Sequence, residues 1–319
     1  MKFNKKNSPA VKPKAQSLMR FAWLSIAAAL ITIGLKSAAY WYTGSVGLLS
    51  DAIESLVNLF AAIMALAMLR LAARPADHKH AYGHGKAEYF SSGFEGILIL
   101  IAAASIMVTA VERLLHPKMI EQLGLGLGIS LLAALVNLLV ALVLFRAAKK
   151  YYSITLEADA HHLMTDVWTS LGVVLGVGSV LLSGWQWLDP AIAILVAMNI
   201  FWVGTKIIRQ SVSGLMDSSL SAAELQKITT ILDAYQEQGV HYHALRTRQA
   251  GAQQYVSMHV LVPGHWTVLV GHQLLERIEL EIRQALPRAV IFTHLEALED
   301  PASWDEEFEL TKTDVLTLR

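Results

Sequence analysis

Two apolar stretches of this sequence carry ionisable and amide side chains at helical spacing. The first, SVGLLSDAIESLVNLF, contains four polar residues at offsets of 0, 3, 4 and 7: Asp51, Glu54, Ser55 and Asn58. The second, LEADAHHLMTDVWTS, contains three at offsets of 0, 3 and 7: Asp159, His162 and Asp166. In an α-helix each set lies on one face. Ionisable groups within an apolar helix are costly, and they are functional candidates by default.

Four of these side chains form a ligand set that suits a transition metal. Two carboxylates, one amide oxygen and one imidazole suit Zn²⁺, and also Fe²⁺, Co²⁺ or Mn²⁺. The predicted site consists of Glu54, Asn58, His162 and Asp166. At a rise of ~1.5 Å per residue, two antiparallel helices would carry all four to matching depths near the middle of a core about 30 Å thick. The alternative is that these groups only hydrogen-bond one another between helices. His161 points to another face, where a packing or headgroup-level role is favoured.

A second cluster lies in the segment ARPADHKHAYGHGKAEYF, which holds Asp77, His78, His80, His84 and Glu88. One Asp and two His residues in a short loop that contains glycine can reach one ion, and a solvated polar loop is the alternative. The segment is not a phosphate-binding loop of the Walker A type, because Ala87 follows Lys86 and position 80 is not glycine. No HExxH stretch occurs, so a zinc metalloprotease has no support.

A third cluster lies beyond residue 240 and consists of His241, His243, His259, His265, His272, His294 and Glu296. Histidine is a common ligand of transition metals. Spacing alone does not say which of these residues converge, and surface histidines on a small domain are the alternative. The sequence contains no cysteine, which excludes disulfide frameworks, thiolate metal sites and cysteine nucleophiles.

The composition indicates a membrane protein. Of 319 residues, 54% are hydrophobic and only 16% are charged, and the mean hydropathy is +0.44. An average globular domain is about 25% charged. The formal net charge is zero, so nothing indicates nucleic-acid binding. A bilayer core needs roughly 20 apolar residues per helix, and six segments meet this need: 17–41, 46–71, 90–114, 123–145, 157–183 and 187–208.

Beyond Leu215 the apolar segments end and charged residues become frequent. The periodicity there predicts helices over 221–237 and 267–285, and strands over 243–249, 254–262 and 289–295. We therefore expect a small α+β domain after a six-helix transmembrane domain. The predicted limits are 1–16 for an N-terminal tail, 17–212 for the transmembrane domain, 213–297 for the α+β domain and 298–319 for a C-terminal tail.

The distribution of Lys and Arg predicts the orientation. These residues gather before the first apolar segment, in the second and fourth connections, and at the end of the sixth segment. Both termini and the α+β domain are therefore expected in the cytoplasm. The N-terminus has lysines but no small-residue cleavage site, so we interpret it as a cytoplasmic tail and not as a signal peptide. The compact loops favour a bacterial inner membrane.

Together these segments resemble the cation diffusion facilitator family of metal exporters, which includes bacterial ferrous-iron and zinc efflux proteins. The resemblance runs from about residue 17 to residue 297. The stretches LLSDAIESLVN and ADAHHLMTD are similar to the family's second-helix and fifth-helix motifs. RPADHKHAYGHGKAE is very similar to the loop that binds a second metal. YHALRTRQAG, YVSMHV and VIFTHLE resemble the metal-binding segments of the cytoplasmic domain.

The resemblance implies a transporter and not an enzyme, with a ferredoxin-like or metallochaperone-like cytoplasmic domain. It implies a homodimer joined largely through these domains, and exchange of metal for protons by alternating access. The loop ligands that it implies are Asp77, His80 and His84. The cytoplasmic ligands that it implies are His243, His259, His272, His294 and Glu296. It also implies that Lys86 pairs with Asp217 across the dimer.

The sequence departs from the family's usual pattern at two positions. Family members usually present Asp or His at position 54 and Asp at position 58, whereas this chain has Glu54 and Asn58. Asn58 carries no charge, so the site has one fewer ionisable group. The oxygen-rich set moves some preference from Zn²⁺ towards Fe²⁺, Co²⁺ and Mn²⁺. His162 argues against the manganese subgroup, which usually has Asp there.

The predicted function is efflux of a divalent transition-metal ion, with Zn²⁺ first and Fe²⁺, Co²⁺, Cd²⁺ or Mn²⁺ as further candidates. Zn²⁺ is also expected as a structural or regulatory ion of the cytoplasmic domain. The principal alternative is a non-transporting membrane metal sensor or scaffold, which would bind metal without flux. A membrane enzyme would need an activated water or a nucleophile beside a substrate site, and nothing else in the chain resembles such a site. A primary pump has no support, because a nucleotide-binding loop is missing from the sequence.

Overall fold

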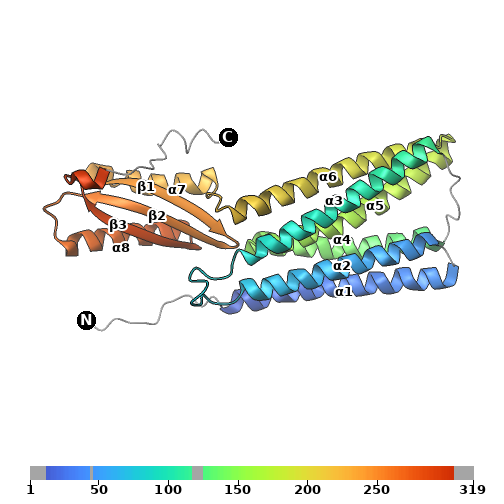
Figure 1. The fold of residues 1–319 in the computed structure, drawn as a ribbon, viewed down its shortest axis with the longest axis horizontal. Coiled ribbons are helices and arrows are strands. Elements are labelled where there is room, and N and C mark those ends of the chain that lie inside the picture. Colours follow the sequence, from blue (N-terminus) through green and yellow to red (C-terminus); the bar gives the residue numbers. More distant parts are fainter. Residues whose placement is uncertain (1–11, 44–45, 117–124, 305–319) are drawn as a thin grey trace. The chain divides into compact units, whose positions relative to one another are not determined.

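The computed structural model describes residues 12–43, 46–116 and 125–304. The predicted tails, 1–16 and 298–319, lie for the most part outside these residues. The chain divides into two compact units, Met1–Val212 and Ser213–Arg319. The predicted fold class is confirmed, because six long apolar helices precede a domain with helices and a three-stranded sheet (Figure 1).

The six helices of the first unit are long and apolar enough to cross a membrane. They are α1 (Lys12–Thr43), α2 (Val46–Ala72), α3 (Ala87–Leu115), α4 (Leu125–Tyr151), α5 (Ile154–Ser183) and α6 (Leu188–Leu215). Successive helices run in opposite directions (Figure 1). Exposed aromatic residues mark one end of the bundle, where Trp41 lies in the last turn of α1 and Trp185 stacks on Trp187 between α5 and α6. Aromatic side chains of this kind are typical of a membrane interface.

All six helices extend past at least one end of the predicted apolar segments, α4 and α6 the furthest. Helix α3 begins at Ala87 instead of residue 90, α4 continues to Tyr151 instead of 145, and α6 continues to Leu215 instead of 208. A segment predicted from hydropathy ends where the first charged residues appear, such as Arg146 and Lys149 after the fourth apolar segment. Arg and Lys are good helix formers, so the helix continues past the apolar core.

Small residues on α5 let α6 approach closely. A Cβ atom added at Gly176 would clash with Asp189, and one added at Gly172 would lie 3.0 Å from the Val196 side chain. Glycines four residues apart on one face are a common means of close helix packing in membranes. On the other side of α6, the hydroxyls of Ser92 and Ser211 hydrogen-bond at 2.6 Å, which joins α6 to α3. Helix α5, which carries two predicted ligands, is thus held by close contacts.

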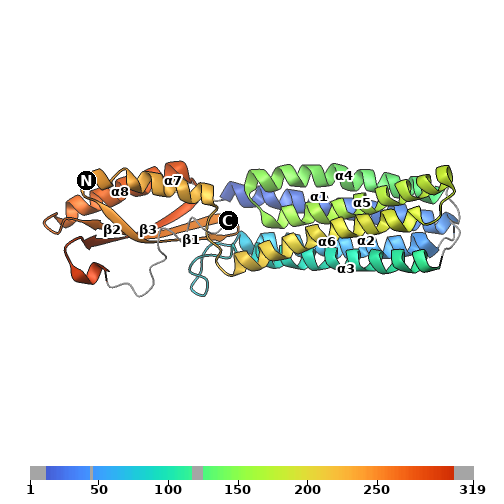
Figure 2. The same cartoon turned by 90° about the horizontal axis from the view of Figure 1, so that it is seen from above.

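The second unit is an α+β sandwich of two layers. Its elements are α7 (Ala222–Asp233), β1 (His241–Ala250), β2 (Gln253–Val262), α8 (Val268–Ala285) and β3 (Ala289–Ala297). The sheet order is β1-β2-β3, with β1 antiparallel and β3 parallel to β2. Both helices cover one face of the sheet (Figure 2), where Val256, Met258 and Val260 meet Ile228 and Ile278 in the core.

The first helix of this unit is shorter than predicted. It ends at Asp233 instead of residue 237, and a separate 3₁₀ turn covers Gln236–Gln238. Gly239 follows with φ of 75°, a conformation that glycine adopts without a steric penalty. The chain then turns into β1.

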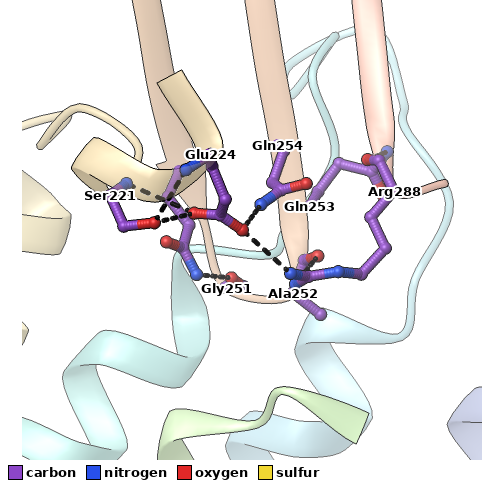
Figure 3. Close-up of polar contacts among 8 residues, drawn as sticks. Ser221, Glu224, Gly251, Ala252, Gln253, Gln254 and Arg288 are labelled. Atoms are coloured by element: carbon purple, nitrogen blue, oxygen red, sulfur yellow. Dashed lines mark hydrogen bonds and ion pairs between the residues drawn. The ribbon is translucent and has the colours of Figure 1, made fainter. Parts of the chain in front are cut away.

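A polar network fixes the start of α7 to the sheet (Figure 3). Ser221 caps the helix and forms a capping box with Glu224. The Glu224 carboxylate also accepts a hydrogen bond from Gln254 Nε2 at 2.6 Å, and it lies 3.6 Å from the Arg288 guanidinium. Burial acts to raise the pKa of Glu224, but the hydrogen bonds from Ser221 and Gln254 and the charge of Arg288 hold it below its ordinary value.

Candidate metal sites

The transmembrane site is a chain of polar contacts between α2 and α5. Asn58 Nδ2 donates to Asp166 Oδ2 at 2.6 Å, and Asn58 Oδ1 lies 2.8 Å from His162 Nε2. Asn58 and His162 are both buried. Since the amide oxygen can only accept, His162 Nε2 carries the hydrogen in this arrangement. His162 Nδ1 is buried without a hydrogen-bond partner among the described residues.

The Asn58 amide lies between the Asp166 carboxylate and the His162 imidazole. A metal ion bound by both of these side chains would have to occupy the same place. The NH₂ group of the Asn58 amide faces Asp166, because the amide oxygen would repel the carboxylate. For an ion to bind Asp166 and His162 together, this amide has to rotate and present its oxygen. Carboxylate, imidazole and amide oxygen are all donors that Zn²⁺ and related ions accept. The site can therefore exchange hydrogen bonds for metal bonds.

Three of the four predicted transmembrane ligands come together, and Glu54 does not join them in this arrangement. Glu54 lies one turn before Asn58 on α2 and is exposed. It belongs to none of the converging groups of three or more His, Asp and Glu ligand atoms in the described part of the chain. Asp51 lies in α2, but its side chain is outside the described residues.

Helix α4 supplies a residue that the sequence analysis missed. Asn137 Nδ2 donates to the same oxygen, Asp166 Oδ2, at 2.8 Å, and Asn137 is 3% exposed. In the sequence, Asn137 stands out only as a single amide side chain within the apolar stretch LLAALVNLLVALVLF. A polar side chain in an apolar membrane helix needs a partner on a neighbouring helix, so such a residue merited attention.

Two other polar residues of α5 have separate partners. Asp159 is buried and accepts a hydrogen bond from Ser25 of α1 at 2.9 Å. His161 meets Phe145 edge to face, with ring centroids 4.8 Å apart. This contact agrees with the packing role favoured for His161.

The loop between α2 and α3 brings its three predicted ligands together. Donor atoms of Asp77, His80 and His84 all lie within 4.8 Å of one another. His80 Nδ1 and His84 Nε2 lie 3.2 and 3.4 Å from the Asp77 carboxylate. The backbone N–H of His80, followed by that of Lys79, lowers the pKa of Asp77. The Asp77 carboxylate is thus ionised and oriented for a cation, whereas His78 lies outside this group.

Glu88 also belonged to the loop cluster in the sequence, but it faces α5. Its buried carboxylate accepts from Ser153 Oγ at 2.5 Å and from the backbone N–H of Thr155 at 3.5 Å. These groups form the N-terminus of α5, where a negative charge is favoured. Glu88 therefore links the first turn of α3 to the helix that carries His162 and Asp166.

In the second unit, strand register places three histidines in one row. His243 pairs with His259 across β1 and β2, and His259 pairs with His294 across β2 and β3. Glu296 lies two residues after His294, on the same face of the strand. Its carboxylate lies 2.8 Å from His243 Nε2 and 3.0 Å from His259 Nδ1. Donor atoms of His243, His259 and Glu296 converge within 4.8 Å and can hold one ion.

The other predicted ligands of this domain lie at or beyond the edge of this group. His294 Nε2 is 3.7 Å from Glu296, and the rings of His259 and His294 have centroids 5.0 Å apart. His272 is exposed on α8 and is outside the converging group. His241 and His265 are exposed as well.

Asp217 lies 3.4 Å from the Arg248 guanidinium within the second unit. Its φ is 58°, so the turn after α6 holds Asp217 in a left-handed conformation. The pair between Lys86 and Asp217 concerns two copies of the chain and stays a prediction.

Comparison with known proteins matches both units. A family model of the cation efflux transmembrane domain matches residues 22–216, and one of the cation efflux protein cytoplasmic domain matches residues 220–298. The uncharacterized transporter sll1263 of Synechocystis sp. is 54% identical over 289 residues, 91% of this chain and 93% of that protein. The cation-efflux pump FieF of Klebsiella pneumoniae is 30% identical over 284 residues, 88% of this chain and 90% of the pump. FieF of Salmonella arizonae is 29% identical over 287 residues, which is 89% of this chain and 93% of that pump.

Six apolar helices that match the cation efflux transmembrane domain, followed by an α+β unit that matches the cation efflux protein cytoplasmic domain, define a membrane transporter of cations. The chain belongs to the cation diffusion facilitator family of cation efflux transporters. It is accordingly an integral membrane transporter of metal cations and not an enzyme, and its cytoplasmic unit is the family's dimerisation domain.

Proposed function

We propose that this protein exports a divalent transition-metal ion, Zn²⁺ in the first place, in exchange for protons. The proposal rests on the buried contacts that join His162, Asn58 and Asp166 between two apolar helices. An imidazole, a carboxylate and an amide oxygen in one place are costly in a membrane and suit a transition metal. Fe²⁺, Co²⁺, Mn²⁺ and Cd²⁺ are the further candidate substrates.

The proposed transport ligands are Glu54, Asn58, His162 and Asp166. In an inward-facing state Asp166 and His162 would bind cytoplasmic metal, and Asn58 would turn its oxygen to the ion. Glu54 would join through a rotation or shift of α2. Ligands bind metal in their deprotonated forms, so loading releases protons. When the site opens outwards, protons compete for the same atoms and release the metal, and a histidine is suited to this exchange.

The proposed orientation has both termini and the cytoplasmic unit on the inner side of a bacterial plasma membrane. Cationic residues in the last turns of α2 and α4 and in the C-terminal third of α6 support it: Arg70, Lys149, Lys150, Lys206 and Arg209. Positive charge is concentrated on the cytoplasmic side of membrane proteins.

The loop site and the cytoplasmic-domain site are proposed to bind regulatory or structural ions, with Zn²⁺ as the expected ion. Their donor atoms converge in the described structure. Ions bound by both copies of a homodimer would stabilise it and bias the transport cycle. The Lys86–Asp217 pair is proposed to join the copies, with Arg248 as a competing partner for Asp217. His272 and His294 would complete the cytoplasmic site by small rearrangements.

The test is metal uptake into proteoliposomes with an imposed pH gradient, with Zn²⁺, Fe²⁺, Co²⁺, Mn²⁺ and Cd²⁺ measured in parallel. We expect gradient-dependent flux that Asp166→Ala abolishes, and the panel would rank the ions. Flux that is independent of the gradient would refute proton exchange. Absence of flux for all five metals, with intact metal binding, would instead favour a sensor or scaffold.

A further inference from the structure

Asn137 is the polar residue that α4 contributes to the transmembrane site. Its Nδ2 donates to Asp166 Oδ2 at 2.8 Å, and its Oδ1 is buried with no hydrogen-bond partner among the described residues. Nearly all buried polar atoms in proteins have a partner, and an exception calls for an explanation such as a missing ion or a function. Within α4 the backbone N–H groups are used by the helix itself, so Oδ1 needs a partner from outside.

The orientation of this amide follows from its neighbour. If the amide were turned over, Oδ1 would face the oxygen of the Asp166 carboxylate, and two acceptors would repel. Nδ2 must therefore face Asp166. The Asn137 oxygen therefore takes no part in that contact, and it is buried on the same amide group that contacts Asp166.

The two amides that hold Asp166 differ in how they use their oxygens. Asn58 uses both ends, since Nδ2 contacts Asp166 and Oδ1 contacts His162. Asn137 uses only its donor. An incoming ion must break a contact to reach the Asn58 oxygen, whereas no described hydrogen bond has to break at the Asn137 oxygen. Asn137 is thus the better prepared of the two oxygen ligands.

We propose that Asn137 is a ligand-bearing residue of the transport site: Nδ2 holds Asp166 in position, and Oδ1 binds the same metal ion. This inference rests on the proposed function. With Asp166, His162 and Asn58 it gives a four-residue set from three helices in the described arrangement, in which Glu54 is exposed. Glu54 would replace one of the two amide oxygens when α2 shifts as proposed above. Four ligands suit a tetrahedral ion such as Zn²⁺.

The experiment measures initial Zn²⁺ uptake against Zn²⁺ concentration in proteoliposomes of the full chain. Asn137→Leu removes both the donor and the oxygen at similar size. Asn137→Asp keeps an oxygen at the Oδ1 position, and the proton that two adjacent carboxylates share takes the place of the Nδ2 donor to Asp166. Asn199→Leu is the matched control, because Asn199 is an exposed asparagine on α6. The thermal unfolding of each purified variant is measured alongside.

We expect Asn137→Leu to raise the KM for Zn²⁺ about 10- to 100-fold, the usual cost of losing a group that supports a metal site. Asn137→Asp should recover most of that loss, and Asn199→Leu should match the wild type. A wild-type KM in Asn137→Leu overturns the proposal, even if unfolding occurs at a lower temperature. If Asn137→Leu does not fold, Asn137→Asp decides: a KM near the wild-type value supports the oxygen ligand, and a KM raised 10-fold or more overturns it.

These outcomes are distinct from failure of the proposed function. If the wild type shows no flux, or flux that survives Asp166→Ala, the transport site itself is misassigned. If the wild type transports, Asp166→Ala does not, and Asn137→Leu behaves as the wild type, only the assignment of Asn137 fails.

Discussion

In the cytoplasmic domain the converging ligands stand on neighbouring strands of one sheet, whereas in the transmembrane unit they stand on separate helices. Strand pairing fixes the His243–His259 row, and the carboxylate of Glu296 reaches both rings at about hydrogen-bond distance. In the membrane, the Asn58 amide occupies the place between Asp166 and His162. Under the proposed assignment, the cytoplasmic site has its donor atoms in place without metal, whereas the transmembrane site has to rearrange to bind an ion.

This difference suits two different tasks. A site on rigid elements with its donors in place retains an ion, because little reorganisation opposes binding. A site whose ligands satisfy one another without metal can release an ion at a smaller cost, because hydrogen bonds replace the metal bonds. Buried polar groups left unpaired would be expensive in a membrane. The amides of Asn58 and Asn137 are therefore suited to a transport site that empties in each cycle.

Substitution of Asp166 should have the largest effect. Asp166→Ala removes the carboxylate and leaves the donors of Asn58 and Asn137 without their acceptor. We expect gradient-driven Zn²⁺ uptake to fall by at least roughly 100-fold, beyond the usual loss for a supporting residue. Uptake by proteoliposomes measures it, and Asp166→Asn, which keeps the size, should be as inactive. Normal uptake by either variant would remove this site from the transport path.

Removal of the strand histidines should abolish one class of bound ions. The variant with His243, His259 and His294 changed to Ala loses the imidazoles around Glu296. We expect equilibrium dialysis of the purified full chain to show at least one ion fewer per chain and a weaker response of transport to cytoplasmic metal. His265→Ala, at an exposed histidine of the same domain, is the control. An unchanged metal response would end the regulatory proposal.

A moderate effect is expected where α5 packs on α6. A Cβ at Gly176 would clash with Asp189, whereas one at Gly178 would meet nothing within 4 Å. Gly176→Ala should therefore cost about 1–3 kcal/mol, which is typical of overpacking, and should lower flux by displacing α5. Gly178→Ala is the matched control. Thermal unfolding and Zn²⁺ uptake are the measurements, and equal behaviour of the two variants would show that the close packing is not required.

The smallest effect concerns the polar network of Figure 3. The folded-state pKa of Glu224 lies below its ordinary value of 4.5. Its ionised form therefore contributes stability above that value, and the contribution is lost as the pH falls through the folded-state pKa. We expect Glu224→Gln to unfold at a lower temperature than the wild type near neutral pH, with the gap closing in acid. Glu237→Gln, at an exposed glutamate, is the control. A gap that does not change with pH would contradict this account.

The order and type of the elements could be predicted because apolar length and periodicity determine them locally. The faces that carry Asn58, His162 and Asp166 were predicted from helical spacing, because a helix fixes which offsets share a face. The row of His243, His259 and His294 could not be derived from spacing, because strand register depends on pairing between segments far apart in the sequence.

Asn137 was missed for a related reason. A single amide in an apolar helix has no periodic partner in its own segment, and its role depends on which helix packs beside it. The exposure of Glu54 was not predicted, because helical spacing shows which residues share a face but not which of them a neighbouring helix covers. Glu88 was grouped with the loop because it is near in sequence, whereas its contacts are with Ser153 and Thr155.

The most direct test of the account compares two variants in the same proteoliposome assay. One lacks Asp166 through Asp166→Ala, and the other lacks His243, His259 and His294. With an imposed pH gradient and saturating Zn²⁺, the account predicts that the first shows only background uptake, while the second retains uptake within a few-fold of the wild type. Retained uptake in the first variant, or complete loss in the second with an intact dimer, would contradict the assignment of transport to the transmembrane site.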